Sequence, residues 1–163
     1  MQRVMVGAVE VIGLLDMVKS YGAAGVYAEV ADRLGEYSDL LETNGGVTLS
    51  FASFLLRGDG RTVLVDTGNG PEADGRLMEE LAQAGVRPEE VDTVLFTHLH
   101  GDHTGWNLDR DTGHARFARA RYLVPRGDWD HYRAQDPAPN SFTRDVMPLE
   151  ALSTGSVTHS RVT

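Results

Sequence analysis

The pattern of apolar and polar residues predicts a sheet in the first half of the chain. Residues 4–15 are largely apolar and contain glycines at 7 and 13, which is typical of a strand pair or one long bent strand. Residues 47–57 carry apolar side chains on both faces, as expected of a strand that is buried on two sides. The sequence Gly58-Asp59-Gly60 then predicts a tight turn into an antiparallel strand over 62–65.

Helical patterns separate and follow these strands. Over 21–41, glycines interrupt a helical spacing of apolar residues, which indicates a loop with short helices. Asp74 is placed to cap a helix that runs to about residue 84, and we interpret Met78 on its apolar stripe as core rather than as a ligand. A short helical turn over 88–91 leads to an apolar strand that stops at Thr97. The order strand, helix, strand predicts a parallel pair with a right-handed crossover.

The last third of the chain repeats this alternation and then becomes rich in proline. Residues 122–124 read as a short buried strand and residues 126–134 as a helix. Prolines at 137, 139 and 148 predict an extended segment near the end. The pattern as a whole predicts an α/β (α+β) fold, in a single domain over residues 1–163.

A cluster of metal-ligand residues follows the strand that stops at Thr97. Within six residues stand three histidines and one aspartate, which are His98, His100, Asp102 and His103. Neutral imidazole and carboxylate are ligands that zinc and related ions take. His98 and His100 project to the same side of an extended backbone and can share one ion, and a sharp turn at Gly101 lets Asp102 and His103 approach a second ion. The alternative is a polar loop whose histidines merely cap the strand end.

At Thr97-His98-Leu99-His100-Gly101-Asp102-His103-Thr104-Gly105 the chain resembles the metallo-β-lactamase superfamily, and most closely its branch of lactonases and organophosphate hydrolases. The resemblance implies an αββα four-layer sandwich, of which this chain covers mainly the N-terminal half. It implies two zinc ions, the first bound by His98 and His100 and the second by Asp102 and His103. It also implies hydrolysis of a small ester, lactone or related substrate by a metal-bound hydroxide, with Asp102 as a catalytic residue that orients the nucleophile.

The sequence Asp66-Thr67-Gly68 stands directly at a strand end and has three interpretations. The resembled family uses an aspartate here to support the histidine loop, a role that would fall to Asp66 together with Thr97. A plain Asx turn that closes the strand is equally compatible with the sequence. A dimeric aspartic protease, in which two such aspartates share a proton, is a further alternative, although it leaves the histidines unexplained.

The resemblance covers roughly residues 4–152, and the family's downstream ligands have no counterpart in that stretch. Two ligands per ion then remain, whereas a catalytic zinc normally holds three protein ligands. His114, His131 and His159 are the other candidates, although a solvent-facing or hydrogen-bonded histidine is more common. The chain is therefore expected to be C-terminally truncated. A catalytically incompetent remnant is an alternative function, and an uncovered sheet face would favour a homodimer.

Composition narrows the classes of partner. The 163 residues are 41% hydrophobic and 24% charged, which is ordinary for a globular domain. A net charge of −9 argues against nucleic acid and anionic membranes as partners, and the resemblance implies a small-molecule substrate. The absence of cysteine excludes thiolate ligands and disulfides. Acidic residues interrupt the apolar N-terminus and no uncharged stretch could span a bilayer, so we expect a soluble, cytoplasmic protein.

Overall fold

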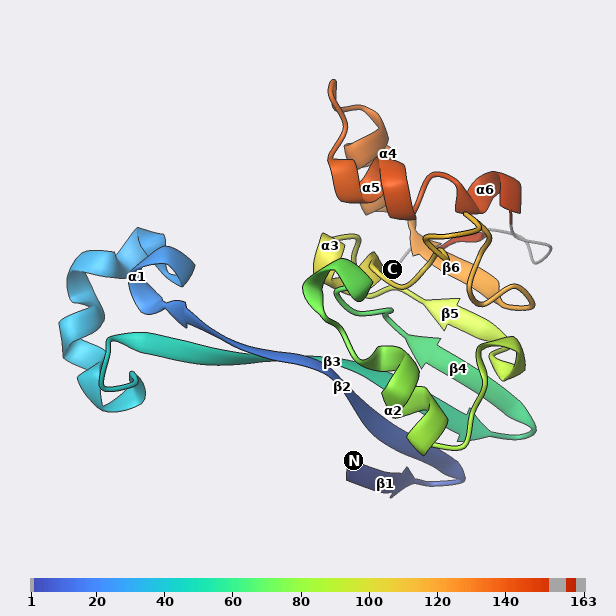
Figure 1. Cartoon of the computed structure of the whole chain (residues 1–163), viewed down its shortest axis with the longest axis horizontal. Coiled ribbons are helices and arrows are strands. Elements are labelled where there is room, and N and C mark those ends of the chain that lie inside the picture. The colour runs from blue at the N-terminus through green and yellow to red at the C-terminus, as the bar shows by residue number, and fades with distance from the viewer. Residues whose placement is uncertain (1, 153–157, 161–163) are drawn as a thin grey trace.

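A computed structural model describes residues 2–152 and 158–160, and over these residues the strands form one seven-stranded sheet in sequence order (Figure 1). The strands are β1 Gln2–Val6, β2 Val9–Gly22, β3 Gly46–Gly58, β4 Arg61–Val65, β5 Thr93–Leu95, β6 Arg121–Pro125 and β7 Thr158–Ser160. The pairs from β1 to β4 are antiparallel, and those from β4 to β7 are parallel. The sheet is therefore mixed, with its direction changing at β4.

Short helices connect the strands. They are α1 Ala23–Val26, η1 Ala28–Leu40, η2 Pro71–Ala73, α2 Leu77–Gln83, η3 Pro88–Glu90, α3 Gly101–Thr104, α4 Arg126–Arg133, α5 Asn140–Asp145 and α6 Leu149–Leu152. A mixed sheet with helices confirms the predicted fold class. In residues 2–152 and 158–160, no helix combines the length and the apolar character that a membrane span requires.

The antiparallel part follows the predicted pattern closely. Gly7 has a φ of +61° at the β1–β2 turn, and β2 then runs further than expected, to Gly22. At the β3–β4 turn, Asp59 and Gly60 have φ values of +50° and +68°, the conformation of a tight hairpin whose strands twist together. The strand pair over the first residues and the hairpin after β3 are therefore both confirmed.

The interpretation of β3 as a strand buried on both faces is wrong. Ser53 and Leu55 are buried, whereas Phe54 between them is 48% exposed. Alternate residues of a strand point to opposite faces, so the face with Ser53 and Leu55 is covered and the face with Phe54 is open. The uncovered face that the sequence predicts therefore exists over the antiparallel strands, where Val4, Val6 and Phe54 are exposed.

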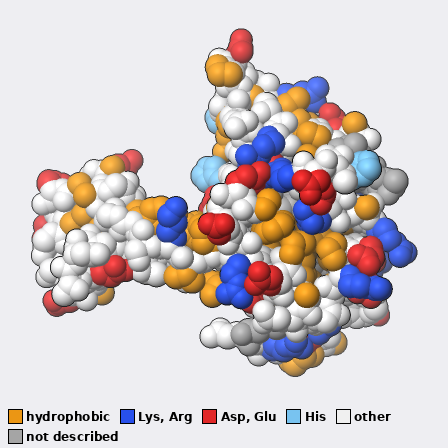
Figure 2. Space-filling model, viewed as in Figure 1, with side chains coloured by type: hydrophobic (Ala, Val, Ile, Leu, Met, Phe, Trp, Pro, Cys, Tyr) orange, Lys and Arg blue, Asp and Glu red, His pale blue; other side chains and the backbone are white. Residues whose placement is uncertain are grey.

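Beyond the sheet body, β2 and β3 continue together as a two-stranded ribbon that carries α1 and η1 at its far end (Figure 1). We call residues 18–50 the arm. The predicted short helices of 21–41 are confirmed, and they lie at the far end of the ribbon, away from α3 (Figure 1). The space-filling view shows acidic and hydrophobic side chains on the end of the arm and histidines on the body (Figure 2).

The parallel part of the sheet contains the predicted crossover, but the predicted N-cap of its helix is wrong. β4 and β5 are parallel and α2 lies between them in sequence, with Leu77 and Leu81 buried and Met78 packed against the core. Asp74 does not cap α2. It ends η2 in a left-handed conformation with φ +56°, while the N–H of Leu77 is held from outside the helix by the side chain of Asp16.

The proline-rich segment is non-helical only up to Pro139, and the helices α5 and α6 that follow correct the prediction of extended chain beyond that residue. Pro139 immediately precedes α5, and Pro148 immediately precedes α6. Proline is compatible with the start of a helix, because the first helical N–H groups need no partner within the helix. Phe142, Val146 and Leu149 are fully buried, and their burial in the core holds these short helices in place.

Candidate functional site

The predicted metal loop lies at the carboxyl edge of the parallel strands. β5 ends at Leu95, which accepts the N–H of Asp66 at 2.9 Å, and Phe96 donates to the carbonyl of Leu123 at 3.1 Å. The chain then bends at Thr97 and continues into α3. Because parallel strands bring their carboxyl ends to one edge, the residues that follow β4, β5 and β6 meet here, where α/β folds usually bind ligands.

The four residues predicted as ligands lie in one cluster. The ring centroid of His98 is 3.9 Å from that of His103 and 4.6 Å from that of His100. Asp102 Oδ2 lies 3.3 Å from His103 Nε2. His98, Asp102 and His103 are half-buried and His100 is exposed. The loop therefore presents imidazole and carboxylate together at a partly open surface.

Asp66 reaches this loop from the end of β4. Its carboxylate accepts the N–H of Thr97 at 2.8 Å and the hydroxyl of Thr97 at 2.7 Å. Its Oδ2 also lies 2.9 Å from Nδ1 of His103. Asp66 is only 6% exposed and has a φ of +60°, an uncommon conformation for a residue other than glycine. These contacts are with the histidine loop rather than with an Asx turn of its own.

The carboxylates and imidazoles perturb one another. Burial lowers the pKa of His103, but hydrogen bonds to Asp102 and Asp66 outweigh burial and raise the pKa to about 9. The hydrogen bond from His103 in turn lowers the pKa of Asp102. Burial, followed by the charges of His103 and His100, lowers the pKa of His98. At neutral pH the cluster therefore contains a neutral His98 and a cationic His103 between two carboxylates.

The side chains of the cluster are of the type that binds a divalent metal ion, but too few of them are arranged around one point. Imidazole and carboxylate donors suit zinc, and the carboxylates of Asp66 and Asp102, 2.9 and 3.3 Å from the His103 ring nitrogens, favour positive charge at this position. Nevertheless, no three histidine, aspartate or glutamate side chains of the described residues are arranged to hold one ion. The described part of the chain thus brings the predicted ligands together without enclosing an ion.

The loop after β4 and the histidine loop are packed directly on each other. Thr67 donates its N–H to the carbonyl of His103 at 2.7 Å, and Gly105 donates to the carbonyl of Gly68 at 2.8 Å. A Cβ atom on Gly105 would lie 2.2 Å from the carbonyl carbon of Asn69. The glycine at 105 is therefore required by this close approach, since any larger residue would separate the two loops.

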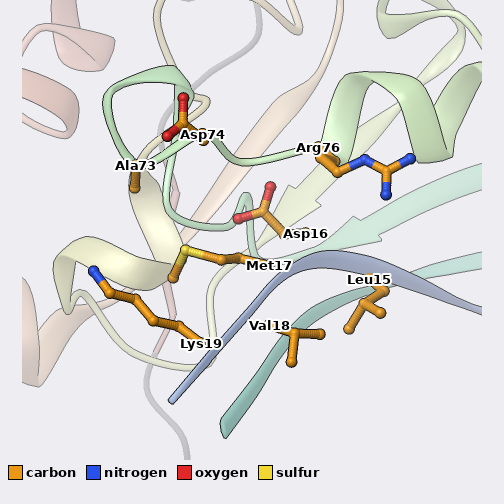
Figure 3. A pocket seen from close by; sticks show the side chains of 8 residues that line it. All are labelled: Leu15, Asp16, Met17, Val18, Lys19, Ala73, Asp74 and Arg76. Atoms are coloured by element: carbon orange, nitrogen blue, oxygen red, sulfur yellow. The ribbon is translucent and has the colours of Figure 1, made fainter. Parts of the chain in front are cut away.

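Asp16 is a buried residue of this region that the sequence does not single out. It is fully buried on β2, and its carboxylate accepts N–H groups from the backbone of Asn69, the side chain of Asn69, the backbone of Leu77 and the indole of Trp106 at 2.7, 3.2, 2.9 and 3.0 Å. Figure 3 shows it pointing from β2 toward segment 73–76, beside a hollow of about 470 Å³.

A sequence signal for Asp16 does exist. Ile12 and Leu14 are buried, so alternation places residue 16 on the same inward face of β2, where a carboxylate needs hydrogen-bond donors. The pairing with β3 shifts register between Leu15 and Met17, directly at this residue. A charged residue at an inward position of an otherwise apolar strand is therefore the signal, whereas its donors could not be identified from sequence.

The remaining histidines do not join the cluster in the part of the chain that is described. His114 is exposed on the segment after the loop. His131 is exposed on α4, where its Nε2 lies 2.8 Å from Nε2 of Gln135. His159 belongs to β7, but its side chain lies outside the described residues, as does most of the segment after 152.

Sequence comparisons place part of the chain in a known superfamily. The model of the metallo-beta-lactamase superfamily matches residues 50–135, just over half of the chain. Mouse metallo-beta-lactamase domain-containing protein 1 is 58% identical over 65 residues, which are 40% of this chain and 24% of the mouse protein. The N-acyl homoserine lactonase AiiB of Agrobacterium fabrum is 30% identical over 80 residues, and the match covers 36% of this chain and 29% of AiiB.

A solved structure extends the comparison to almost the whole fold. AidC, a dizinc quorum-quenching lactonase, superimposes with a TM-score of 0.74 at 19% sequence identity, covering 93% of this chain and 56% of AidC. This likeness concerns the fold, and it confirms the mixed α/β architecture of the N-terminal part of such proteins. The chain covers 24% of the length of the mouse protein, 29% of that of AiiB and 56% of that of AidC. By the family match and the fold together, the chain belongs to the metallo-beta-lactamase superfamily.

Proposed function

We propose that this chain carries the histidine-loop part of a zinc-dependent, binuclear hydrolase site that acts on a small ester or lactone. The superfamily and the structural neighbours are hydrolases, which supports the reaction class. The observation that carries the proposal is the packing of the His98, His100 and His103 rings, with centroids 3.9 and 4.6 Å apart, at the carboxyl edge of the sheet. An edge of this kind binds ligands in other α/β proteins.

In this proposal His98 and His100 hold one ion, and Asp102 and His103 hold the other. Asp66 occupies Nδ1 of His103, so Nε2, on the side of Asp102, is the nitrogen left for an ion. The lowered pKa of His98 keeps its lone pair free, whereas His103 must lose a proton before it can act as a ligand. When bound, zinc supplies Lewis acidity and a nucleophilic water at neutral pH.

The proposed substrate class comes from the relatives. AiiB is named an N-acyl homoserine lactonase, and AidC is described as a dizinc quorum-quenching lactonase. A lactone or another small ester is therefore the first class to examine. The aspartic protease alternative finds no support, because Asp66 is buried and its carboxylate is hydrogen-bonded to Thr97 and His103.

The second candidate function is a remnant without working chemistry. It is favoured by one observation, namely that no group of three metal-binding side chains exists among the described residues. A catalytic zinc normally needs three protein ligands. On this alternative the chain would fold but would bind zinc weakly and hydrolyse nothing.

The zinc content of the purified protein distinguishes the proposed hydrolase site from the inactive remnant. We expect about two zinc ions per chain by elemental mass spectrometry, and slow lactone hydrolysis that a chelator abolishes. The double variant His98→Ala/His100→Ala should lose zinc, whereas His114→Ala, which removes an exposed histidine outside the cluster, should not. Asp102→Ala should remove most of the hydrolysis. Zinc-free wild-type protein, or equal zinc in the wild type and the double variant, would reject the proposal.

A further inference from the structure

The peptide between the two paired histidines is held by a residue from another element. The N–H of Leu99 donates to Oδ2 of Asp128 at 2.9 Å, across 29 positions of sequence. Leu99 itself is 1% exposed, so its side chain points into the core while its neighbours His98 and His100 face the cluster. The position of this one peptide therefore affects the rings on both sides of it.

Irregular chain needs such partners. The N–H of Phe96 makes the last hydrogen bond to β6, and residues 97–100 belong to no strand or helix, so their amides have no regular ladder. Two of these amides are bound by carboxylates, that of Thr97 by Asp66 and that of Leu99 by Asp128. Asp66 follows β4 and Asp128 follows β6, which are the two neighbours of β5 in the sheet. The histidine loop is thus bound from both flanking strands.

The element that carries Asp128 is anchored firmly. Asp128 lies in the first turn of α4, and the next residue, Trp129, is 3% exposed and packs edge-on against Phe142 with ring centroids 5.3 Å apart. Burial of a large aromatic ring fixes the helix against the core. The carboxylate of Asp128 is consequently presented to Leu99 from a fixed backbone.

We propose that Asp128 is a positioning residue for the pair His98 and His100, because its carboxylate fixes the peptide that joins them. This inference rests on the proposed function, in which these two histidines hold one ion. A group that orients metal ligands without touching the metal typically changes metal affinity about 10- to 100-fold when it is removed. Asp128 would act in this way through the backbone, which is why the histidine motif alone does not reveal it.

The test compares three variants of the whole chain. Asp128→Ala removes the acceptor, whereas Asp128→Asn keeps an oxygen that can accept the Leu99 N–H. Asp130→Ala is the matched control, since Asp130 lies on the same helix, is exposed, and has its carboxylate 3.9 Å from Arg126 rather than on the histidine loop. Titration with Co²⁺, followed by its visible spectrum, gives the metal affinity, and hydrogen exchange of the Leu99 amide in metal-free protein reports the hydrogen bond itself.

We expect Asp128→Ala to weaken Co²⁺ binding about 10- to 100-fold and to speed exchange of the Leu99 amide. Asp128→Asn and Asp130→Ala should stay within roughly threefold of wild type. Unchanged exchange or unchanged affinity in Asp128→Ala would overturn the inference while leaving the proposed function intact. Wild-type protein that binds no Co²⁺ would overturn both. Should Asp128→Ala fail to fold, Asp128→Ser, whose hydroxyl is too short to reach Leu99, must show the same losses.

Discussion

The carboxyl edge of the sheet and the arm are built in opposite ways. At the edge, the buried polar side chains of Asp16, Asp66 and Thr67 are hydrogen-bonded to residues 31 to 90 positions away. On the arm, η1 has thirteen residues and none is buried, and its pair Arg33–Glu36 lies on the surface. The edge therefore depends on long-range contacts, whereas the arm is held by the ladder between β2 and β3.

This difference predicts where the protein tolerates change. Surface ion pairs contribute little to stability, and exposed helices gain little from packing. A buried polar group without its partner is costly. Substitutions at the edge should consequently lower the free energy of unfolding in urea more than matched substitutions on the arm.

The largest contrast is expected between two aspartates. Asp16→Ala should lower the free energy of unfolding by about 3–5 kcal/mol, because four N–H groups lose their acceptor within the fold. Asp39→Ala, at an exposed position of the arm, should change it by no more than about 0.5 kcal/mol. If Asp16→Ala lowered the free energy of unfolding by less than Asp39→Ala does, the role of long-range contacts would be contradicted.

Two glycines give the next contrast. Gly105→Ala should cost about 3 kcal/mol, because its Cβ would lie 2.2 Å from the backbone of Asn69. At Gly35 on the arm a Cβ meets nothing within 4 Å, so Gly35→Ala should gain up to about 0.5 kcal/mol from reduced chain entropy. Thermal unfolding of both variants checks the opposite signs, and two equal effects would refute the close approach.

The loss of one hydrogen-bond donor to Asp16 should have a smaller effect than the loss of the carboxylate itself. Trp106→Phe removes the indole N–H that lies 3.0 Å from Asp16 and keeps most of the ring's bulk. The free energy of unfolding should fall by about 1 kcal/mol, since the same carboxylate oxygen still accepts the N–H of Leu77. Tyr27→Phe on the arm is the control, because Tyr27 is 46% exposed. A loss as large as that of Asp16→Ala would mean that packing of Trp106 dominates.

The smallest expected effect depends on pH. Burial opposes ionisation of Glu72, but hydrogen bonds from its own backbone and from Arg110 outweigh burial and lower its pKa. A lowered folded-state pKa means that the contribution is complete above pH 4.5 and is lost as the pH falls through the folded value. Because Glu72 is largely exposed, Glu72→Gln should reduce this acid dependence by only about 0.5 kcal/mol, with Glu29→Gln as the control on the arm.

Local patterns predicted most of the elements and the ligand cluster. The hairpin at Asp59 and Gly60, the parallel strands and the positions of His98, His100, Asp102 and His103 all depend on residues close in sequence. Turn conformation, strand alternation and ligand spacing are local properties, so they can be predicted before the fold is known. The cap assigned to Asp74 was wrong because a tertiary contact from Asp16 holds the N–H of Leu77 instead, and extended chain was wrongly predicted beyond Pro139, where burial in the core stabilises short helices.

By itself, then, the sequence determined the strand and helix types, the histidine motif and, through that motif, the superfamily. Only the tertiary structure decided which carboxylates hold the loop, since Asp16 and Asp128 contact it across 90 and 29 positions. It also decided that one face of β3 is open and that the arm leaves the body. The physical reason is that a buried hydrogen bond requires both partners to be in place, and the fold alone brings distant partners together.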